Sequence, residues 1–317
     1  MLHIVVASAS IDIQYVVDSV AYGSLFALMA LSLSLLFGVM GLMNFAYGEL
    51  IMAGAYTMYY TEGWGTLPMV IMVVVVVTAL SLLMELVAFR PLRGATPVVL
   101  LIASFALSYG LEALGWMTVG SGIQKGVGSW LSTTYDVDGV LISELEIVTW
   151  IVTIALLVGM TLLIKRTMLG IHLRASTEDF RMAQLTGVRA NWIISAAFAI
   201  TGVLASAVAI LYTFRVGAIS PDMGQGPLLI AFVGGVIGGL GSMAGATLGG
   251  FVLGVVINAL QALLPLSINS HTQLFAFAVV IAILVFLPGG LISVRIGVVR
   301  QWWRRLRRVP AAEGAAP

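Results

Sequence analysis

Long uninterrupted apolar segments constrain the fold of this chain more than any other feature. The segment Leu67–Ala88 is long enough to cross a bilayer as a helix, which takes about 20 mostly apolar residues. Because only 9% of the 317 residues are charged and 60% are hydrophobic, the chain cannot cover a water-soluble surface of its size. The sequence therefore predicts an all-α polytopic membrane protein. It excludes a soluble enzyme, a DNA-binding protein and a disordered chain.

Residue types that carry much of enzyme chemistry are missing or scattered. The chain has no Cys, which removes thiolate catalysis, disulfides and Cys-ligated metal sites. Its histidines, His3, His172 and His271, are far apart and lack the spacing of a metal site. No Gly-rich segment ends in Gly-Lys-Ser/Thr, so a Walker A nucleotide site is absent from the sequence. We predict no catalytic residue, no metal and no cofactor in this chain.

The basic residues indicate how the chain is oriented in the membrane. Of its 15 basic residues, 13 lie in the segments 90–93, 165–189 and 295–308, which the positive-inside rule places in the cytoplasm. The segments between these clusters give nine spans with the N-terminus outside, or eight if 15–61 forms one broken hairpin. The expected spans are 15–41, 44–61, 66–89, 98–118, 147–164, 191–214, 227–241, 243–264 and 272–294.

Glycines recur at four-residue spacing in the last third of the chain. The pairs Gly234/Gly238, Gly241/Gly245 and Gly245/Gly249 have the GxxxG spacing that lets membrane helices approach closely. They predict either ordinary helix packing or a packed pair that lines a solute path. Residues 38–44 and 235–242 also resemble each other, which indicates the kind of internal repeat found in transporters.

An Asn and a Glu stand between two apolar segments in Met43-Asn44-Phe45-Ala46-Tyr47-Gly48-Glu49-Leu50. A carboxylate at membrane depth is costly unless it is paired or faces water, so Glu49 should face protein or a cavity rather than lipid. Two interpretations remain open. The segment is part of a solute path or its gate, or it is a turn near the interface with Glu49 in water.

The segment 165–190 is the only long cytoplasmic loop that the span assignment leaves. Ser176 or Thr177 can cap a short helix whose first turn holds Glu178 and Asp179, and Gly187 is a natural stop. Such a short helix is marginal in water, so its apolar residues should dock on a partner. The alternative is a basic loop lying on the bilayer surface. The apolar residues of this helix are Phe180, Met182, Ala183 and Leu185.

Other charged residues have plainer interpretations. The tail 296–317 is rich in Arg and Trp, which is typical of a juxtamembrane anchor rather than a nucleic-acid site. Glu85 precedes Arg90 by five residues and is expected to form an interfacial ion pair with it. Glu112 is expected to be a carboxylate at the outer end of its helix.

Four motifs together resemble the H-type (LivH) permease subunit of bacterial branched-chain amino acid ABC importers. The resemblance covers roughly residues 15–295, and Tyr47 stands where the family usually has His. The motifs are Asn44-Phe45-Ala46-Tyr47-Gly48-Glu49, Arg90-Pro91-Leu92-Arg93-Gly94, Arg174-Ala175…Asp179…Met182-Ala183…Gly187-Val188 and Gly234-Gly235…Gly238-Gly239-Leu240-Gly241-Ser242…Gly245-Ala246.

The resemblance implies an ABC importer permease fold over 1–295, with a cytoplasmic tail at 296–317, in a bacterial inner membrane. It implies as partners an M-type permease, two ATPase subunits that bind ATP, and a periplasmic solute-binding protein. The path candidates are Asn44, Phe45, Tyr47, Glu49, Ser242 and Gly245. The residues expected to couple to the ATPase are Arg174, Glu178, Asp179, Phe180, Met182, Ala183 and Gly187.

Three alternatives to branched-chain amino acid import remain at this stage. Related permeases serve other small solutes such as amides and urea. An ion-coupled secondary transporter would need a buried carboxylate with an ion role, for which Glu49 is the candidate. A structural or receptor-like membrane subunit is disfavoured by the Gly-rich segments.

Overall fold

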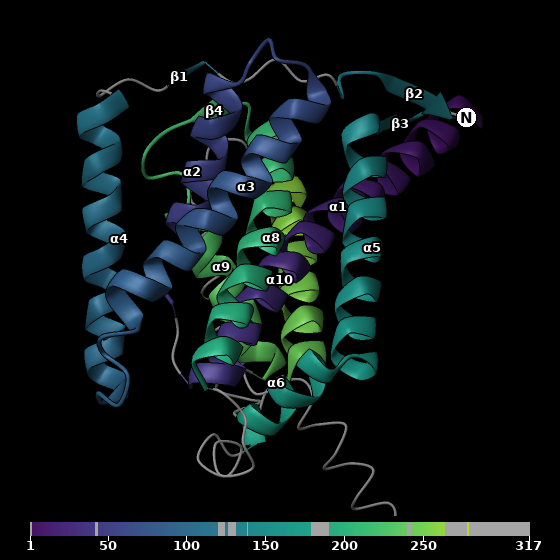
Figure 1. Ribbon diagram of the computed structural model, residues 1–317. Coiled ribbons are helices and arrows are strands. Elements are labelled where there is room, and N and C mark those ends of the chain that lie inside the picture. Colours follow the sequence, from purple (N-terminus) through teal and green to yellow (C-terminus); the bar gives the residue numbers. More distant parts are fainter. Residues whose placement is uncertain are drawn as a thin grey trace, which may run out of the picture.

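The computed structural model describes residues 2–41, 44–119, 124–125, 131–137, 139–178, 190–239, 242–263 and 278. These residues are mostly helical, with two short antiparallel β pairs (Figure 1). The helices are α1 (Leu2–Met40), α2 (Tyr47–Tyr60), α3 (Thr66–Met84), the π-helical turn η1 (Glu85–Phe89), α4 (Pro97–Val119), α5 (Glu144–Arg166), α6 (Met168–Glu178), α8 (Ala190–Val216), α9 (Gln225–Gly238) and α10 (Met243–Leu263). The strands are β1 (Gln124–Lys125), which pairs with β4 (Ala218–Ile219), and β2 (Thr134–Val137), which pairs with β3 (Val140–Ser143).

Six helices in the described part of the chain are long and apolar enough to cross a membrane. They confirm the helical polytopic architecture and six of the expected spans. Two expected spans differ, because α2 and α9 have only 14 residues each. At 1.5 Å per residue such a helix is about 21 Å long, against about 30 Å for the hydrocarbon core. Of the expected span 272–294, the structure describes only residue 278.

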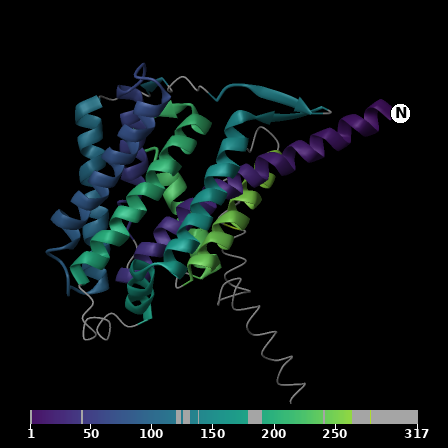
Figure 2. The same ribbon diagram turned by 45° about the vertical axis from the view of Figure 1, so that its right-hand side comes forward.

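Helix α1 forms the centre of the bundle. Its second half is buried along all sides, as shown by Leu25, Leu28 and Leu35, and it packs against α5, α8, α9 and α10. Its first half leaves the bundle beside the β2–β3 hairpin (Figure 2). There the backbone N–H of Leu141 donates to Oε1 of Gln14 at 2.8 Å, which ties the hairpin to α1.

Helix α5 begins where the sequence chemistry requires it to begin. Ser143 accepts a hydrogen bond from the Glu146 N–H, and the Glu146 side chain accepts one from the Ser143 N–H, forming a capping box. Lys165 and Arg166 lie in the last turn, where cations are favourable for the helix dipole. The charges at its two ends therefore agree with the orientation that the basic clusters predict.

The repeated glycines bring helix backbones into contact. A Cβ on Gly234 of α9 would lie 2.7 Å from the Cα of Gly250 of α10, and one on Gly254 would lie 2.7 Å from the Cα of Gly23 of α1. Contacts this close leave no room for a side chain at these glycine positions. The close approach of helices that the glycine spacing predicts is therefore confirmed.

Candidate functional site

The two short helices meet at their N-terminal ends. A Cβ on Gly48, in the first turn of α2, would lie 2.9 Å from the carbonyl oxygen of Gly224 at the start of α9. Conversely, a Cβ on Gly224 would overlap the carbonyl oxygen of Gly48. From this contact α2 runs into the upper part of the molecule and α9 into the lower part (Figure 1). Two half-length helices thus begin at one point inside the bundle, as in the discontinuous helices of many transporters.

Polar turns on either side bring the chain to this contact. The side-chain oxygen Oδ1 of Asn44 accepts a hydrogen bond from the Ala46 N–H at 3.0 Å, a turn typical of Asn that directs the chain into α2. Before α9, the Gln225 N–H donates to the Asp222 carbonyl at 3.1 Å. Each helix then carries a polar residue directly after its glycine, Glu49 in α2 and Gln225 in α9.

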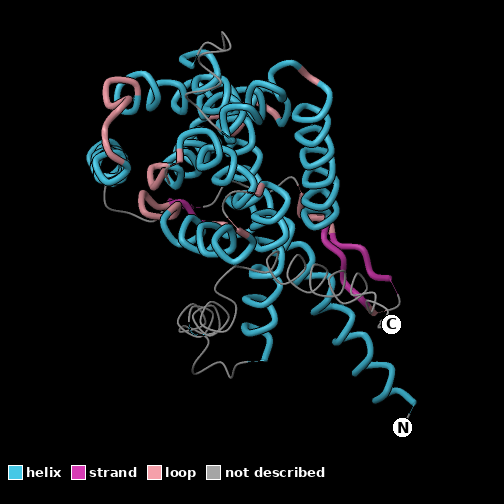
Figure 3. The backbone as a smooth tube through the Cα atoms, turned by 90° about the horizontal axis from the view of Figure 1, so that it is seen from below, coloured by secondary structure: helices cyan, strands magenta, loops and turns pink. Residues whose placement is uncertain are grey.

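One face of α4 covers the α2–α9 junction. The Ser108 hydroxyl donates to Oε1 of Glu49 at 2.8 Å. One turn along, Glu112 accepts from Nε2 of Gln225 at 2.6 Å. The ring of Phe105 stacks on Phe45 with centroids 4.1 Å apart. Helix α4 otherwise stands at the edge of the bundle, as the view from below also shows (Figure 3). Its polar face is therefore attached to the starts of both short helices.

The junction has more negative charge than positive charge. Glu49 is 1% exposed, and its Oε2 atom has no hydrogen-bond partner in the described part of the chain. The same holds for Nδ2 of Asn44, which is 2% exposed. Glu85 forms an ion pair with Arg93, whereas no cationic side chain that the structure describes pairs with Glu49 or Glu112. A buried carboxylate without a counter-charge is costly, so Glu49 lacks an interaction that would stabilise its charge.

The predicted path residues fall into two groups. Asn44, Phe45 and Glu49 lie at the junction. Tyr47 is fully buried in the first turn of α2, where its hydroxyl is not hydrogen-bonded to any described residue. Ser242 and Gly245 lie at the other end of α9, where the Ser242 hydroxyl accepts from the Gly245 N–H at 3.2 Å and caps α10.

Three residues of the junction were not predicted from the sequence to belong to a functional site. Ser108 and Glu112 have helical i, i+4 spacing in an otherwise apolar span, a signal that could have identified a polar face. Glu112 was expected to be only a helix-end carboxylate, yet it bonds to Gln225 of α9. Gln225 carries no signal of its own, because its role depends on a contact between helices that are far apart in sequence.

A second buried carboxylate lies at the first residue of η1, directly after α3. Glu85 is fully buried, forms an ion pair with Arg93 and accepts from the Ser195 hydroxyl at 2.9 Å. Arg93 also donates to Asn191 at the start of α8. The expected pairing with Arg90 is wrong. The turn η1 adds a residue to the helix, with the Arg90 N–H donating to the Glu85 carbonyl, and Arg90 is exposed.

The predicted coupling residues are described only in part. Arg174 lies in α6, which ends at Glu178. Because Ser176 and Thr177 lie inside α6, they do not begin a helix, and that expectation is corrected. The Thr167 hydroxyl instead accepts from the Gly170 N–H at 3.1 Å at the start of α6. The remaining coupling residues lie outside the described residues: Asp179, Phe180, Met182, Ala183 and Gly187.

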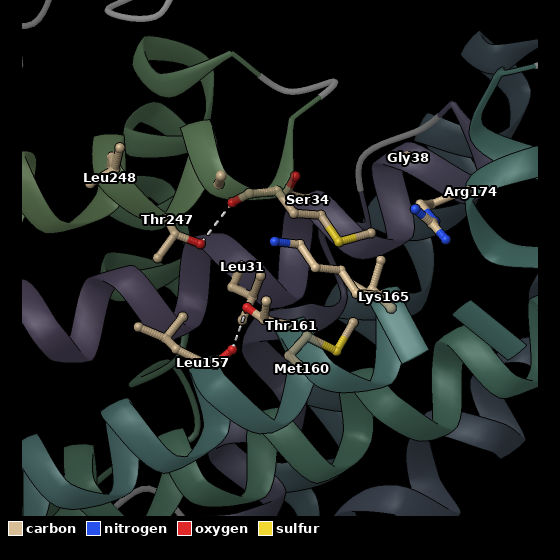
Figure 4. Close-up of a pocket in the computed structure, with 13 residues that line it drawn as sticks. Leu31, Ser34, Gly38, Leu157, Met160, Thr161, Lys165, Arg174, Thr247 and Leu248 are labelled. Carbon is tan, nitrogen blue, oxygen red and sulfur yellow. Dashed lines mark hydrogen bonds between the residues drawn. The ribbon is translucent and has the colours of Figure 1, made fainter. Parts of the chain in front are cut away.

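A cavity of about 560 Å³ lies between α1, α5, α6 and α10 (Figure 4). Its walls are mostly apolar, and Lys165 and Arg174 provide its cationic side chains. It is separate from the α2–α9 junction and contains none of the predicted path residues. Its lining consists of Leu31, Ser34, Gly38, Leu157, Met160, Thr161, Ile164, Lys165, Arg174, Met243, Ala244, Thr247 and Leu248.

Comparison with known protein families shows to which family the chain belongs. The family described as branched-chain amino acid transport system, permease component, matches residues 15–284. The chain belongs to this family. It is therefore a multi-pass membrane permease, a transport subunit rather than an enzyme, and the resemblance seen in its motifs is confirmed.

Curated relatives are similar to the chain over nearly their whole length. The high-affinity branched-chain amino acid transport system permease protein BraD of Pseudomonas aeruginosa is 32% identical over 89% of this chain and 95% of its own length. The corresponding protein LivH of Escherichia coli K12 is 28% identical over the same shares. A probable branched-chain amino acid transport permease of Methanocaldococcus jannaschii is 28% identical over 92% of this chain and 93% of its own length. No solved structure matches the chain.

Proposed function

We propose that this chain is one permease subunit of an ATP-driven ABC importer for branched-chain amino acids in a bacterial inner membrane. The observation that supports this most is the similarity to branched-chain permeases over nearly the full length of both chains. A sequence without a Walker A motif needs partners that hydrolyse ATP. We therefore propose an M-type permease, two ATPase subunits and a periplasmic solute-binding protein as partners.

Coupling to the ATPases is assigned to the cytoplasmic segment 165–190. ATP-driven closure of the ATPase pair would shift this segment and change the path from inward-facing to outward-facing. Helix α6 packs on α1, α5 and α8, so a displacement of the segment reaches the bundle through three helices. Arg174, Glu178 and the undescribed residues up to Gly187 are the proposed contacts.

The path itself is assigned to the α2–α9 junction and to the start of α10. Asn44, Phe45, Tyr47 and Glu49 are its proposed residues at the junction, and Ser242 with Gly245 at the cytoplasmic end of α9. In the described conformation the contact between Gly48 and Gly224 closes the junction. Solute passage therefore requires the starts of α2 and α9 to separate.

Transport assays with the assembled complex test this proposal. Vesicles containing the permease pair and the ATPases, supplied with the binding protein and internal ATP, should take up leucine after the proton gradient and membrane potential are collapsed. Uptake that needs the gradient would favour an ion-coupled transporter. Uptake of an amide or urea in place of leucine would keep the importer class and change the substrate.

Docking of the coupling segment is tested separately. Met182→Asp places a charge on the proposed apolar docking face, which is costly if that face is desolvated. Co-purification of the ATPase subunits and leucine uptake should both fall, while the amount of permease in the membrane stays normal. Ile171→Asp is the control, because it adds a charge at an exposed side chain of α6 in the same loop. Wild-type ATPase binding by Met182→Asp would support a membrane-surface role for the segment instead.

A further inference from the structure

The α2–α9 junction has the chemistry of a site for a positively charged group. Two carboxylates approach it, Glu49 from α2 and Glu112 from α4. Both accept hydrogen bonds from neutral donors: Glu49 from Ser108, and Glu112 from Gln225 and from Nε1 of Trp116. No cation whose side chain the structure describes pairs with either carboxylate. The remaining acceptor, Oε2 of Glu49, is buried and has no partner there. A bound cation would supply the missing interaction.

The same junction is also suited to a negatively charged group. The N-terminal ends of α2 and α9 meet at Gly48 and Gly224, and a helix N-terminus has a partial positive charge with unsatisfied N–H groups. Each helix has 14 residues, long enough for a substantial dipole. Both glycines lack side chains that would cover the backbone. The N–H groups of Tyr47, Glu49 and Gln225 already donate to carbonyls of the preceding turns, and Pro227 has no N–H. A carboxylate reaching this point would therefore find one backbone donor from each helix, the N–H groups of Gly48 and Gly226.

We propose that the junction binds the transported amino acid as its zwitterion. Glu49 and Glu112 accept hydrogen bonds from the α-ammonium group, and the separated starts of α2 and α9 bind the α-carboxylate. This inference rests on the proposed function and deepens it, because it places the recognition of the substrate's main-chain groups at named residues. The buried amide of Asn44, whose Nδ2 has no described partner, is a further donor for the carboxylate.

Apolar side chains next to these polar groups suit the hydrocarbon part of such a substrate. Phe45 stacks on Phe105 at 4.1 Å and approaches Phe232 of α9 at 5.7 Å. Met52 lies further along α2, beside Gly115 of α4. Aromatic and Met side chains form adaptable apolar surfaces. The junction thus combines two carboxylates, two helix N-termini and an apolar wall within three helices.

Photo-crosslinking locates the substrate without requiring a loss of function. The assembled complex in vesicles, with the binding protein and ATP, is supplied with photo-leucine, a zwitterionic leucine analogue carrying a diazirine. Illumination during turnover should label peptides from 44–52, 105–116 or 223–232, and excess leucine should compete. Labelling confined to the cavity between α1, α5 and α10, or absent from these three segments, would overturn the proposal.

Charge removal tests the ammonium contact. Glu49→Gln and Glu112→Gln should each lower leucine uptake at least about tenfold, because a hydrogen bond between charged groups is replaced by a neutral one. Glu146→Gln is the matched control, since Glu146 is a buried carboxylate whose capping role Gln can fill. Co-purification with the partner subunits shows that each variant is folded. Leucine uptake at the wild-type rate by both junction variants would contradict the proposal.

The outcomes separate this inference from the proposed function. If the wild-type complex imports leucine and the junction variants are unaffected, the site is wrong and the importer assignment stands. If the wild-type complex imports no leucine under any condition, the proposed function fails. If leucine uptake depends on an external cation and Glu49→Gln removes that dependence, the carboxylates bind an inorganic cation, and the zwitterion site is refuted.

Discussion

Two buried glutamates, one at the α2–α9 junction and one directly after α3, show how differently this fold treats the same side chain. Glu85 has Arg93, Ser195 and the turn η1 around it, so its charge is neutralised and both oxygens are hydrogen-bonded. Glu49 has one neutral donor, Ser108, and an oxygen without a described partner. A complete arrangement contributes to stability. An incomplete one costs stability and is available for a ligand.

The largest effect on stability is expected where a complete arrangement is broken. Arg93→Ala leaves Glu85 buried without its counter-charge, which typically costs about 3–5 kcal/mol of unfolding free energy. Thermal unfolding in detergent and the yield of folded protein measure the effect. Arg90→Ala is the control, because this exposed side chain lies in the same turn. Equal losses for the two variants would contradict the pairing of Glu85 with Arg93.

A smaller but substantial effect is expected at the junction backbone. Gly224→Ala introduces a Cβ that would overlap the Gly48 carbonyl, and overpacking of this kind costs about 1–3 kcal/mol. Melting temperature and leucine uptake should both fall. Gly159→Ala on α5 is the control, since a Cβ there meets no atom within 4 Å and Ala favours the helix. A stability unchanged by Gly224→Ala would show that α2 and α9 do not meet as described.

Removing one hydrogen bond from the complete arrangement should have a moderate effect. Ser195→Ala deprives Glu85 of one donor and keeps the ion pair with Arg93, so a loss of about 1–2 kcal/mol is expected. Denaturation in detergent compares this variant with Ser206→Ala, whose hydroxyl donates to the Val203 carbonyl on its own helix. If Ser195→Ala behaved like Ser206→Ala, the hydrogen bond from Ser195 of α8 to Glu85 would contribute nothing to stability.

The smallest effect on stability is expected at Glu49. Glu49→Gln keeps an acceptor for Ser108 and removes a charge that has no counter-ion, so stability should stay within about 1 kcal/mol of wild type or rise slightly. Differential scanning fluorimetry of Glu49→Gln beside Glu85→Gln measures the contrast directly. A destabilisation as large as that of Glu85→Gln would mean that Glu49 is a structural residue.

Several parts of this architecture follow from the sequence. Apolar length predicts nine spans, of which six are helices in the described part of the chain that are long enough to cross the membrane. The cost of a carboxylate in lipid predicts that Glu49 is buried in protein, and it is 1% exposed. The GxxxG spacing predicts the close approach of α9 and α10. Each of these inferences depends on local composition, which a single sequence displays.

Other parts depend on contacts that no local pattern shows. The partner of Glu85 is Arg93 and not Arg90, because η1 and a turn with Gly94 at φ 91° change which basic side chain returns to the helix. In the sequence, the apolar segments that contain α2 and α9 look like full spans. In the structure, each helix begins only where Gly48 meets Gly224. Gln225 acquires its role from α4, which lies more than 100 positions away in the sequence.

The reciprocal contact between Gly48 and Gly224 has a consequence for how the permease opens. Each glycine blocks the other's helix start, so neither end can become accessible while the other stays closed. Separation therefore uncovers both positive helix ends in one step, beside the two carboxylates. We therefore expect the substrate-facing groups of both helices to become accessible together when the permease opens at this point.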